Sequence, residues 1–181
     1  MKRTRLVIGA WLGSVLLSAC GSSPRTAEPL RPASLPEPSS RPAIAAISPA
    51  DYVANAAAID LYVIKASELA LQRSTTLKVR EAATLLIEAH RGSASQLSMG
   101  GRRLNLLPGT ELQPRHRALL EQLYSSASFD RDYALQMRVV HQEAALLHSN
   151  YAASGSSPTL SQIARVLAPM MAQQQRLISY L

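Results

Sequence analysis

Apolar side chains return every three or four positions along most of the chain after residue 48, which is the period of an amphipathic helix. Four long stripes of this kind, over residues 52–70, 79–97, 133–151 and 160–181, predict four long helices. A shorter apolar run predicts an extra helix over about 114–124. No run of alternating apolar and polar residues is long enough to predict a strand. The pattern therefore predicts an all-α fold, a four-helix bundle with a short extra helix between helices two and three.

Signals for helix starts stand in front of these stripes. Ser48-Pro49 and Ser157-Pro158 each place a capping serine before a proline at the first helical position. Asp130, in the first turn after Ser128, favours the positive end of the third helix dipole. Inside the fourth stripe lies Pro169, which we expect to kink that helix because it lacks an N–H group.

The first nineteen residues have a different pattern. A basic start, Lys2-Arg3-Thr4-Arg5, precedes an apolar run over 6–17 that is too short to span a bilayer of about 30 Å. Such a segment is typical of a secretory signal. The run ends in Leu17-Ser18-Ala19-Cys20, which resembles the lipobox of bacterial lipoproteins. The resemblance implies cleavage before Cys20 and lipid on its thiol; the alternative is a buried or free cysteine after an ordinary signal.

Residues 20–48 are expected to form a tether. Seven of the eleven prolines in the chain lie between residue 21 and residue 49, and proline fixes φ and removes a hydrogen-bond donor. We therefore predict an extended, disordered linker over 20–48 and a single folded domain over 49–181. The lipid would attach the protein to a membrane. Because the residue after Cys20 is Gly21 and not aspartate, resemblance to lipoproteins favours the outer membrane, facing the periplasm.

Composition excludes several classes of function. The formal charge is +7, but three of the basic residues lie in the signal segment and the arginines are scattered, so we expect no nucleic-acid partner. Cys20 is the only cysteine, which excludes an internal disulfide. Neither a Gly-x-Ser-x-Gly sequence nor a catalytic cysteine is present, and we do not expect an enzyme. An envelope protein or a cell-wall polymer remains open as a partner.

Short motifs in the folded part resemble one bacterial family, the domain-of-unknown-function family "four-one-four-two" of ferritin-like periplasmic proteins. The matching segments are 78–90, Leu107-Pro108, 128–133, His141-Gln142-Glu143 and Leu167-Ala168-Pro169. The resemblance implies a ferritin-like helical bundle over nearly all of residues 50–181. It implies no established activity.

The same resemblance points to candidate metal ligands. The family pairs an acidic residue with a histidine two positions later, here Glu88 and His90, and carries a His-x-Glu, here His141 and Glu143. Two features are missing. Gln174 stands where a histidine is common on the fourth helix, and the acidic residues common in the middle of the first helix are not found near Val63 and Lys65.

The spacing of these residues argues against a di-iron centre. Ferritin-like di-metal sites need Glu-x-x-His motifs, and the chain has none. Residues two apart on a helix, such as Glu88 and His90, lie about 200° apart and cannot both face one ion.

A looser site is conceivable. His90 falls on the apolar stripe of the second helix, and His141 shares a face of the third helix with His148. If these two helices meet, His90 and His141 approach each other and could bind zinc or copper. The alternative is that each is a hydrogen-bonded histidine at the edge of the core. Methionines 137, 170 and 171 could suggest copper but are more typical of core packing. His116, between two arginines, is expected in solvent.

Two functions follow from these patterns. The first is a lipid-anchored cell-envelope protein that acts as a binding or structural module, with no cofactor. The alternative is a ferritin-like metal-binding or redox protein that holds a divalent metal ion with the histidines of its second and third helices.

Overall fold

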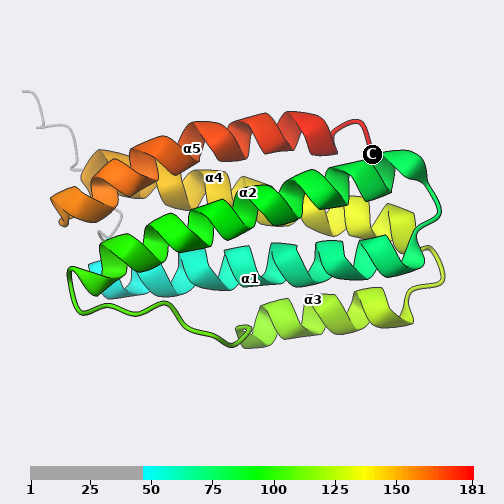
Figure 1. Cartoon of the computed structure of the whole chain (residues 1–181), viewed down its shortest axis with the longest axis horizontal. Helices are drawn as coiled ribbons and strands as arrows, with labels where there is room; N and C mark the ends of the chain where they lie inside the picture. Colours follow the sequence, from blue (N-terminus) through cyan, green and yellow to red (C-terminus); the bar gives the residue numbers. More distant parts are fainter. Residues whose placement is uncertain (1–46) are drawn as a thin grey trace, which may run out of the picture. The chain divides into compact units, whose positions relative to one another are not determined.

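A computed structural model describes residues 47–181, which form five helices and, within that range, no strand (Figure 1). The helices are α1 (Pro49–Arg73), α2 (Leu77–Arg102), α3 (Pro114–Ser125), α4 (Phe129–Ser154) and α5 (Pro158–Ile178). The predicted all-helical class is thus confirmed. The predicted signal segment, Cys20 and the predicted linker up to residue 46 lie outside the described residues.

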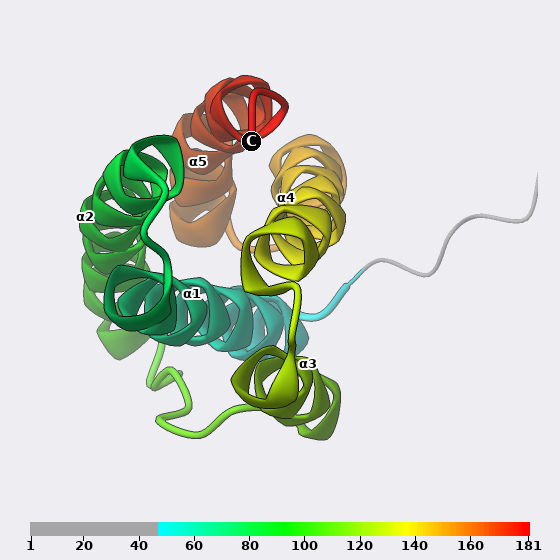
Figure 2. The same ribbon diagram turned by 90° about the vertical axis from the view of Figure 1, so that its right-hand side faces the viewer.

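Four of the helices surround a shared core. α1 packs against α2 and α4, and α5 packs against α4 and α2, so that the four long helices enclose the apolar interior in the end view (Figure 2). The short helix α3 lies outside this group, against α1 and α4. Each long helix turns its predicted stripe inward, because burial of apolar surface is the main favourable term in folding.

The helix starts follow the expected chemistry in part. Ser48 caps α1 by accepting the backbone N–H of Asp51, and Ser157 caps α5 by accepting that of Leu160. Ser128 stands at the N-cap of α4 but its side chain makes no capping bond. α5 runs as one helix through Pro169.

Arg73, the last residue of α1, holds α3 in place. Its guanidinium donates to the carbonyl oxygens of Leu123 and Tyr124, at 2.5 and 2.9 Å, and to that of Ser126 at 2.8 Å. These are groups at the C-terminal end of α3, where a helix leaves carbonyls unpaired and favours a cation. The same guanidinium lies 4.9 Å from the centre of the Phe129 ring.

The core is unusually polar at its centre. Beside the aliphatic residues it buries the rings of Tyr52, Tyr62, Tyr133 and Tyr151. Among the buried polar side chains, one carboxylate and several imidazoles come from facing helices; these are Asp60, His90, His141 and His148. Buried polar groups need hydrogen-bond partners, so this region determines how the helices align.

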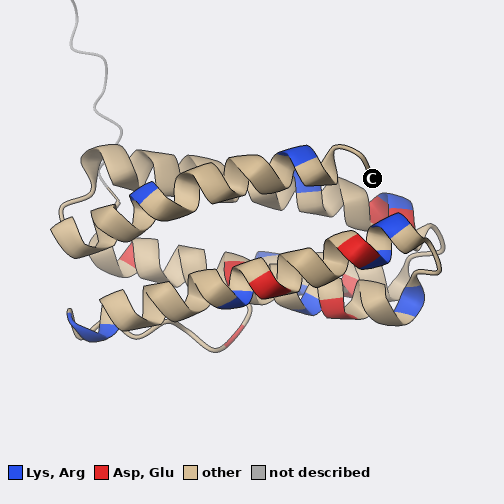
Figure 3. Cartoon of the chain, turned by 45° about the horizontal axis from the view of Figure 1, so that its top comes forward, with Lys and Arg blue, Asp and Glu red and all other residues tan. Residues whose placement is uncertain are grey.

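Apart from Asp60, the Lys, Arg, Asp and Glu residues of 47–181 are partly or fully exposed, and they are distributed unevenly among the helices (Figure 3). α5 carries Arg165 and Arg176 and no acidic residue. None of the helices in residues 47–181 combines the length and apolar character that crossing a membrane requires.

Two glycines of α2 should respond in opposite ways to alanine. A Cβ on Gly101 would overlap the backbone carbonyl oxygen of Leu106, whereas one on the exposed Gly92 would meet nothing within 4 Å. We expect Gly101→Ala to lower the free energy of unfolding by on the order of 2 kcal/mol. Gly92→Ala should raise it by about 0.5–1 kcal/mol, because glycine loses more backbone entropy on folding. Urea unfolding of both variants checks this, and equal effects would contradict it.

Candidate functional site

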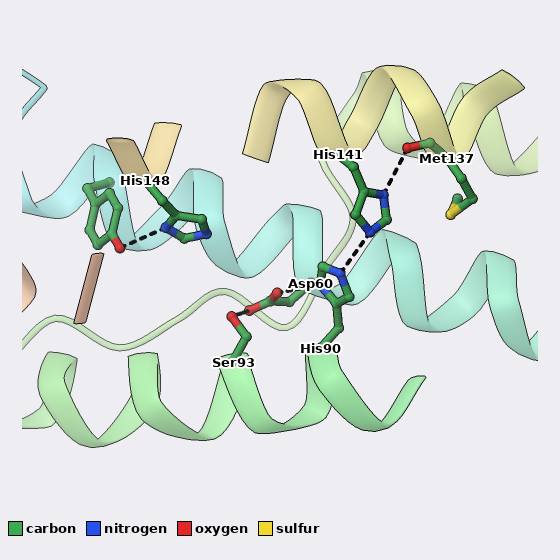
Figure 4. Close-up of polar contacts among 7 residues, drawn as sticks. Asp60, His90, Ser93, Met137, His141 and His148 are labelled. Atoms are coloured by element: carbon green, nitrogen blue, oxygen red, sulfur yellow. Dashed lines mark hydrogen bonds and ion pairs between the residues drawn. The ribbon is translucent and has the colours of Figure 1, made fainter. Parts of the chain in front are cut away.

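Two histidine rings meet in the middle of the core. His90 on α2 and His141 on α4 bring their Nε2 atoms to 3.2 Å, with the ring planes at 88° (Figure 4). Both residues are fully buried. The structure therefore brings together the two histidines whose approach the sequence analysis left dependent on contact between their helices.

Each ring is oriented through its other nitrogen. His90 Nδ1 lies 2.7 Å from Oδ1 of Asp60 on α1, and His141 Nδ1 lies 2.8 Å from the carbonyl oxygen of Met137, one turn earlier on α4 (Figure 4). Ser93 donates to the second carboxylate oxygen of Asp60 at 2.9 Å. This is the arrangement in which a carboxylate or carbonyl fixes the tautomer of a metal-binding histidine.

These contacts determine where the protons lie. A carbonyl oxygen only accepts, so His141 Nδ1 carries a hydrogen and a neutral His141 presents a lone pair at Nε2. The 3.2 Å contact then requires a hydrogen on His90 Nε2. One proton thus lies between the two Nε2 atoms. A cation that replaced it would find two nitrogen lone pairs converging on the same point.

Burial shapes the protonation of this group. The pKa of Asp60 is raised by burial, while the contacts with His90 and Ser93 oppose the rise. Burial and the neighbouring His90 lower the pKa of His141 to about 3. His141 is therefore neutral at ordinary pH, which is the form of imidazole that binds a metal ion.

Asp60 is the functional residue that sequence analysis missed. No acidic residue was assigned to the middle of the first helix, yet Asp60 lies there and is 1% exposed. The signal was present: Asp60 lies four residues after Ala56 and three before Val63, on the same apolar stripe. A carboxylate on a buried stripe must find a partner.

The other candidate ligands do not reach the pair. Glu88 is exposed, and Glu143 forms an ion pair with Arg115 of α3. His148 lies further along α4, where its Nδ1 is 2.9 Å from the hydroxyl of Tyr52. Glutamates two positions from a buried histidine face away from it, as the helical period requires.

His116 corrects a second expectation. It was expected in solvent, but it lies on the buried face of α3, is fully buried and stacks on the ring of Tyr62 of α1 at 5.3 Å. Neither of its ring nitrogens has a hydrogen-bond partner. Burial, with the adjacent Arg115, lowers its pKa. Flanking arginines misled the sequence interpretation because neighbours in sequence point to different sides of a helix.

Gln174 on α5 completes the surroundings of the pair. It is 7% exposed, and it lies close enough to His141 to favour its protonated form. Neither Oε1 nor Nε2 of its amide has a hydrogen-bond partner. Gln174 also lines a groove of about 310 Å³ between α2 and α5, so one side of this residue faces a cavity. An orphaned amide in such a place can receive a ligand or move.

Within residues 47–181 no group of three His, Cys, Asp or Glu side chains is placed to hold a metal ion. The pair offers two imidazole nitrogens, with Gln174 nearby and Asp60 behind His90. Chemically it can hold a proton or a cation that accepts few ligands.

Comparisons with known proteins agree with the helical fold. The sequence model of the family described as "Domain of unknown function (DUF4142)" matches residues 33–181. No curated protein gives a significant match.

Solved structures with the same arrangement include "CopM in the Cu(II)-bound form", at 16% identity and a TM-score of 0.64, covering 75% of this chain and 95% of that one. "CopM in the Cu(I)-bound form" matches at 15% identity and 0.62, covering 74% and 94%. A DUF305 fragment from Deinococcus radiodurans matches at 18% identity and 0.64, covering 72% and 92%. At these identities the likeness shows a shared helical fold.

Acid should destabilise the protein through His148. Burial, with His90 nearby, lowers its pKa to about 4, whereas an unfolded histidine has a pKa of about 6.5. Between these values the unfolded chain binds more protons, so stability is lost as the pH falls from 6.5 towards 4. His148 alone contributes on the order of 3 kcal/mol.

Denaturant unfolding at a series of pH values measures this loss. In His148→Gln the slope of stability against pH between 6.5 and 4 should be smaller than in the unaltered protein. Equal slopes in the two proteins would show that His148 is not the buried neutral base described above.

Proposed function

We propose that this chain, which belongs to the DUF4142 family, is a cell-envelope protein that binds a zinc or copper ion between His90 and His141. The description of the family leaves its activity open, so the proposal is based on the geometry of the core. This develops the second of the two functions inferred from sequence.

One observation carries the proposal, the convergence of two oriented imidazoles. With metal–nitrogen bonds of about 2.0 Å, the Nε2 separation of 3.2 Å corresponds to an angle of about 105° at the ion, close to tetrahedral. The ion would replace the proton between the rings without a large movement of either helix. Asp60 and the Met137 carbonyl would keep both rings in the orientation that binds it.

Copper is supported by two of the structural neighbours, which are described as CopM in Cu(II)-bound and Cu(I)-bound forms. Their low identity carries no ligand over to this chain. They do support the idea that a helical frame of this kind can hold copper, and imidazole is a suitable ligand for it.

The arrangement is best described as a ferritin-like four-helix bundle with α3 as an addition. What supports this is the packing of four long helices around one core, with polar side chains projecting inward from facing helices. A ferritin-type di-iron centre would need four carboxylates in that interior, and Asp60 is the buried acid among residues 47–181. The proposed site is therefore a mononuclear one.

The location we propose is the outer membrane, facing the periplasm. The N-terminal sequence supports this location. It has the pattern of a signal segment over 1–19, Cys20 in a lipobox-like context and a proline-rich linker over 20–48, followed by the domain at 49–181. A lipid anchor of two or more chains gives stable attachment. The linker would let the folded domain reach ions in the periplasm.

Metal titration tests the site. We expect the purified protein to bind one copper or zinc ion per chain, and His90→Gln and His141→Gln to weaken binding by more than about 100-fold. Asp60→Asn, which removes only an outer partner, should cost about 10–100-fold. His116→Gln is the matched control, because His116 is a buried histidine of α3 outside the proposed site, and its replacement should leave binding unchanged. Folded protein that binds neither ion would overturn the proposal.

Lipid attachment has its own test. Cells that express the full chain should incorporate labelled palmitate into it, and Cys20→Ala should abolish the label, because no other cysteine is available. Label that persists in the variant would exclude lipidation at this residue.

A further inference from the structure

We propose that the ion held by His90 and His141 is monovalent copper, Cu(I), and that it enters through the groove between α2 and α5, where Met170 receives it and Gln174 forms the gate to the histidines. The inference rests on the proposed function and adds the charge of the ion and its route. It is drawn from the groove, the orphaned amide and the charge of the core.

The groove between α2 and α5 shares one residue, Gln174, with the surroundings of the metal-binding pair. Its walls are Leu85, Leu86 and Ala89 of α2 and Met170, Gln173, Gln174 and Leu177 of α5. The exposures of these residues fall in order, from the exposed Leu85 through the partly exposed Met170 to the buried Gln174. Gln174 is the one that also neighbours His141. Gln174 therefore lies between the groove on one side and His141 on the other, and it is the residue an ion would have to pass.

Gln174 has the properties of a gate. The residue is 7% exposed, and neither polar atom of its amide makes a well-oriented hydrogen bond. A buried amide normally has hydrogen-bond partners, and leaving it unpaired is unfavourable. The amide lies beside His141 without a well-oriented hydrogen bond to it, so little holds the side chain in one position. It can turn aside as the ion passes, or its Oε1 can approach the ion once bound.

Met170 is the donor at the entrance. It is the sulfur-bearing side chain in a groove whose other walls are aliphatic or amide groups. Thioethers are soft ligands that select Cu(I) over harder ions such as Zn(II). A single thioether in an apolar groove attracts Cu(I) without holding it firmly, so the ion can continue to the imidazoles.

The charge of the core favours a monovalent ion. Asp60 is the only acidic side chain buried among residues 47–181, and the two rings are otherwise neutral ligands. One positive charge at the pair balances the carboxylate. A divalent ion would leave one uncompensated charge in the core, which is unfavourable. Unless an anion entered with it, a divalent ion would bind less well.

The number of ligands points the same way. Structural zinc sites take four ligands, and catalytic ones take three from the protein. Within residues 47–181 no three His, Cys, Asp or Glu side chains converge. Cu(I) is a d¹⁰ ion that can bind with three ligands. Two ligands alone would favour a linear arrangement with the Nε2 atoms about 4 Å apart, so at 3.2 Å the two imidazoles need the Gln174 oxygen as the third ligand.

Transfer of Cu(I) from its bicinchoninate complex tests the proposal. The full-length chain, purified in detergent and kept without oxygen, should remove one Cu(I) per chain, and a tenfold excess of Zn(II) should not displace it. Met170→Leu keeps the volume and the apolar character. It should slow transfer by about tenfold, the scale on which association rates vary among variants of one site, and leave the equilibrium affinity within about twofold.

Two further variants make the result specific. Met99→Leu is the matched control, because Met99 is an exposed methionine in a separate groove between the same two helices; its transfer rate should equal that of the unaltered protein. Gln174→Ala opens the gate and should speed transfer.

Three results would overturn the inference in distinguishable ways. Transfer to Met170→Leu as fast as to Met99→Leu would exclude the entry route but leave the site intact. Displacement of Cu(I) by equimolar Zn(II) would exclude selection of a monovalent ion. Absence of binding of either ion would overturn the proposed function itself.

Discussion

A carboxylate buried in a helical core must be paired, and this constraint organises the whole arrangement. Asp60 is 1% exposed on α1, so its charge or its proton has to be accommodated by groups from other helices. α2 supplies both partners, His90 and Ser93, which are three residues apart and therefore on one face. The contact fixes the register of α1 against α2. A slip by one residue would leave Asp60 facing apolar side chains.

The constraint extends to a third helix. Because Asp60 occupies Nδ1 of His90, the free Nε2 points away from α1 and towards α4, where His141 meets it. Three helices are thus connected through one hydrogen-bonded chain that ends on the backbone carbonyl of Met137. Such networks specify one packing among several of similar apolar burial, since each alternative would leave a buried polar group unsatisfied. The same network turns the two Nε2 atoms towards one point, with one proton between them, so that stability and the proposed binding would depend on the same residues.

The site differs from a ferritin centre in its ligands although the helices are arranged similarly. A helical frame shared at 15–18% identity with CopM and a DUF305 fragment shows only that such frames recur. What is particular to this chain is the small number of charges inside it. In the site we propose, one acid, two facing imidazoles and an unpaired amide that lines a groove would favour a single ion of low charge. The N-terminal anchor, which lies outside the described residues, remains a prediction from sequence alone.

Local patterns in the sequence determined the helices themselves. Apolar periodicity and the Ser-Pro starts placed all five within a few residues, because a helix depends on contacts three and four positions apart and on its own caps. The same period showed that Glu88 and Glu143 could not face one ion together with the histidines beside them in sequence. It also placed His90 on the buried stripe. Only the tertiary structure decided which residues meet across helices. Four features join segments distant in sequence: the pairing of His90 with His141, the contact of Asp60 with His90, the burial of His116 against Tyr62 and the position of Gln174 beside His141. Their geometry depends on the packing of several helices at once, and no local pattern carries that information.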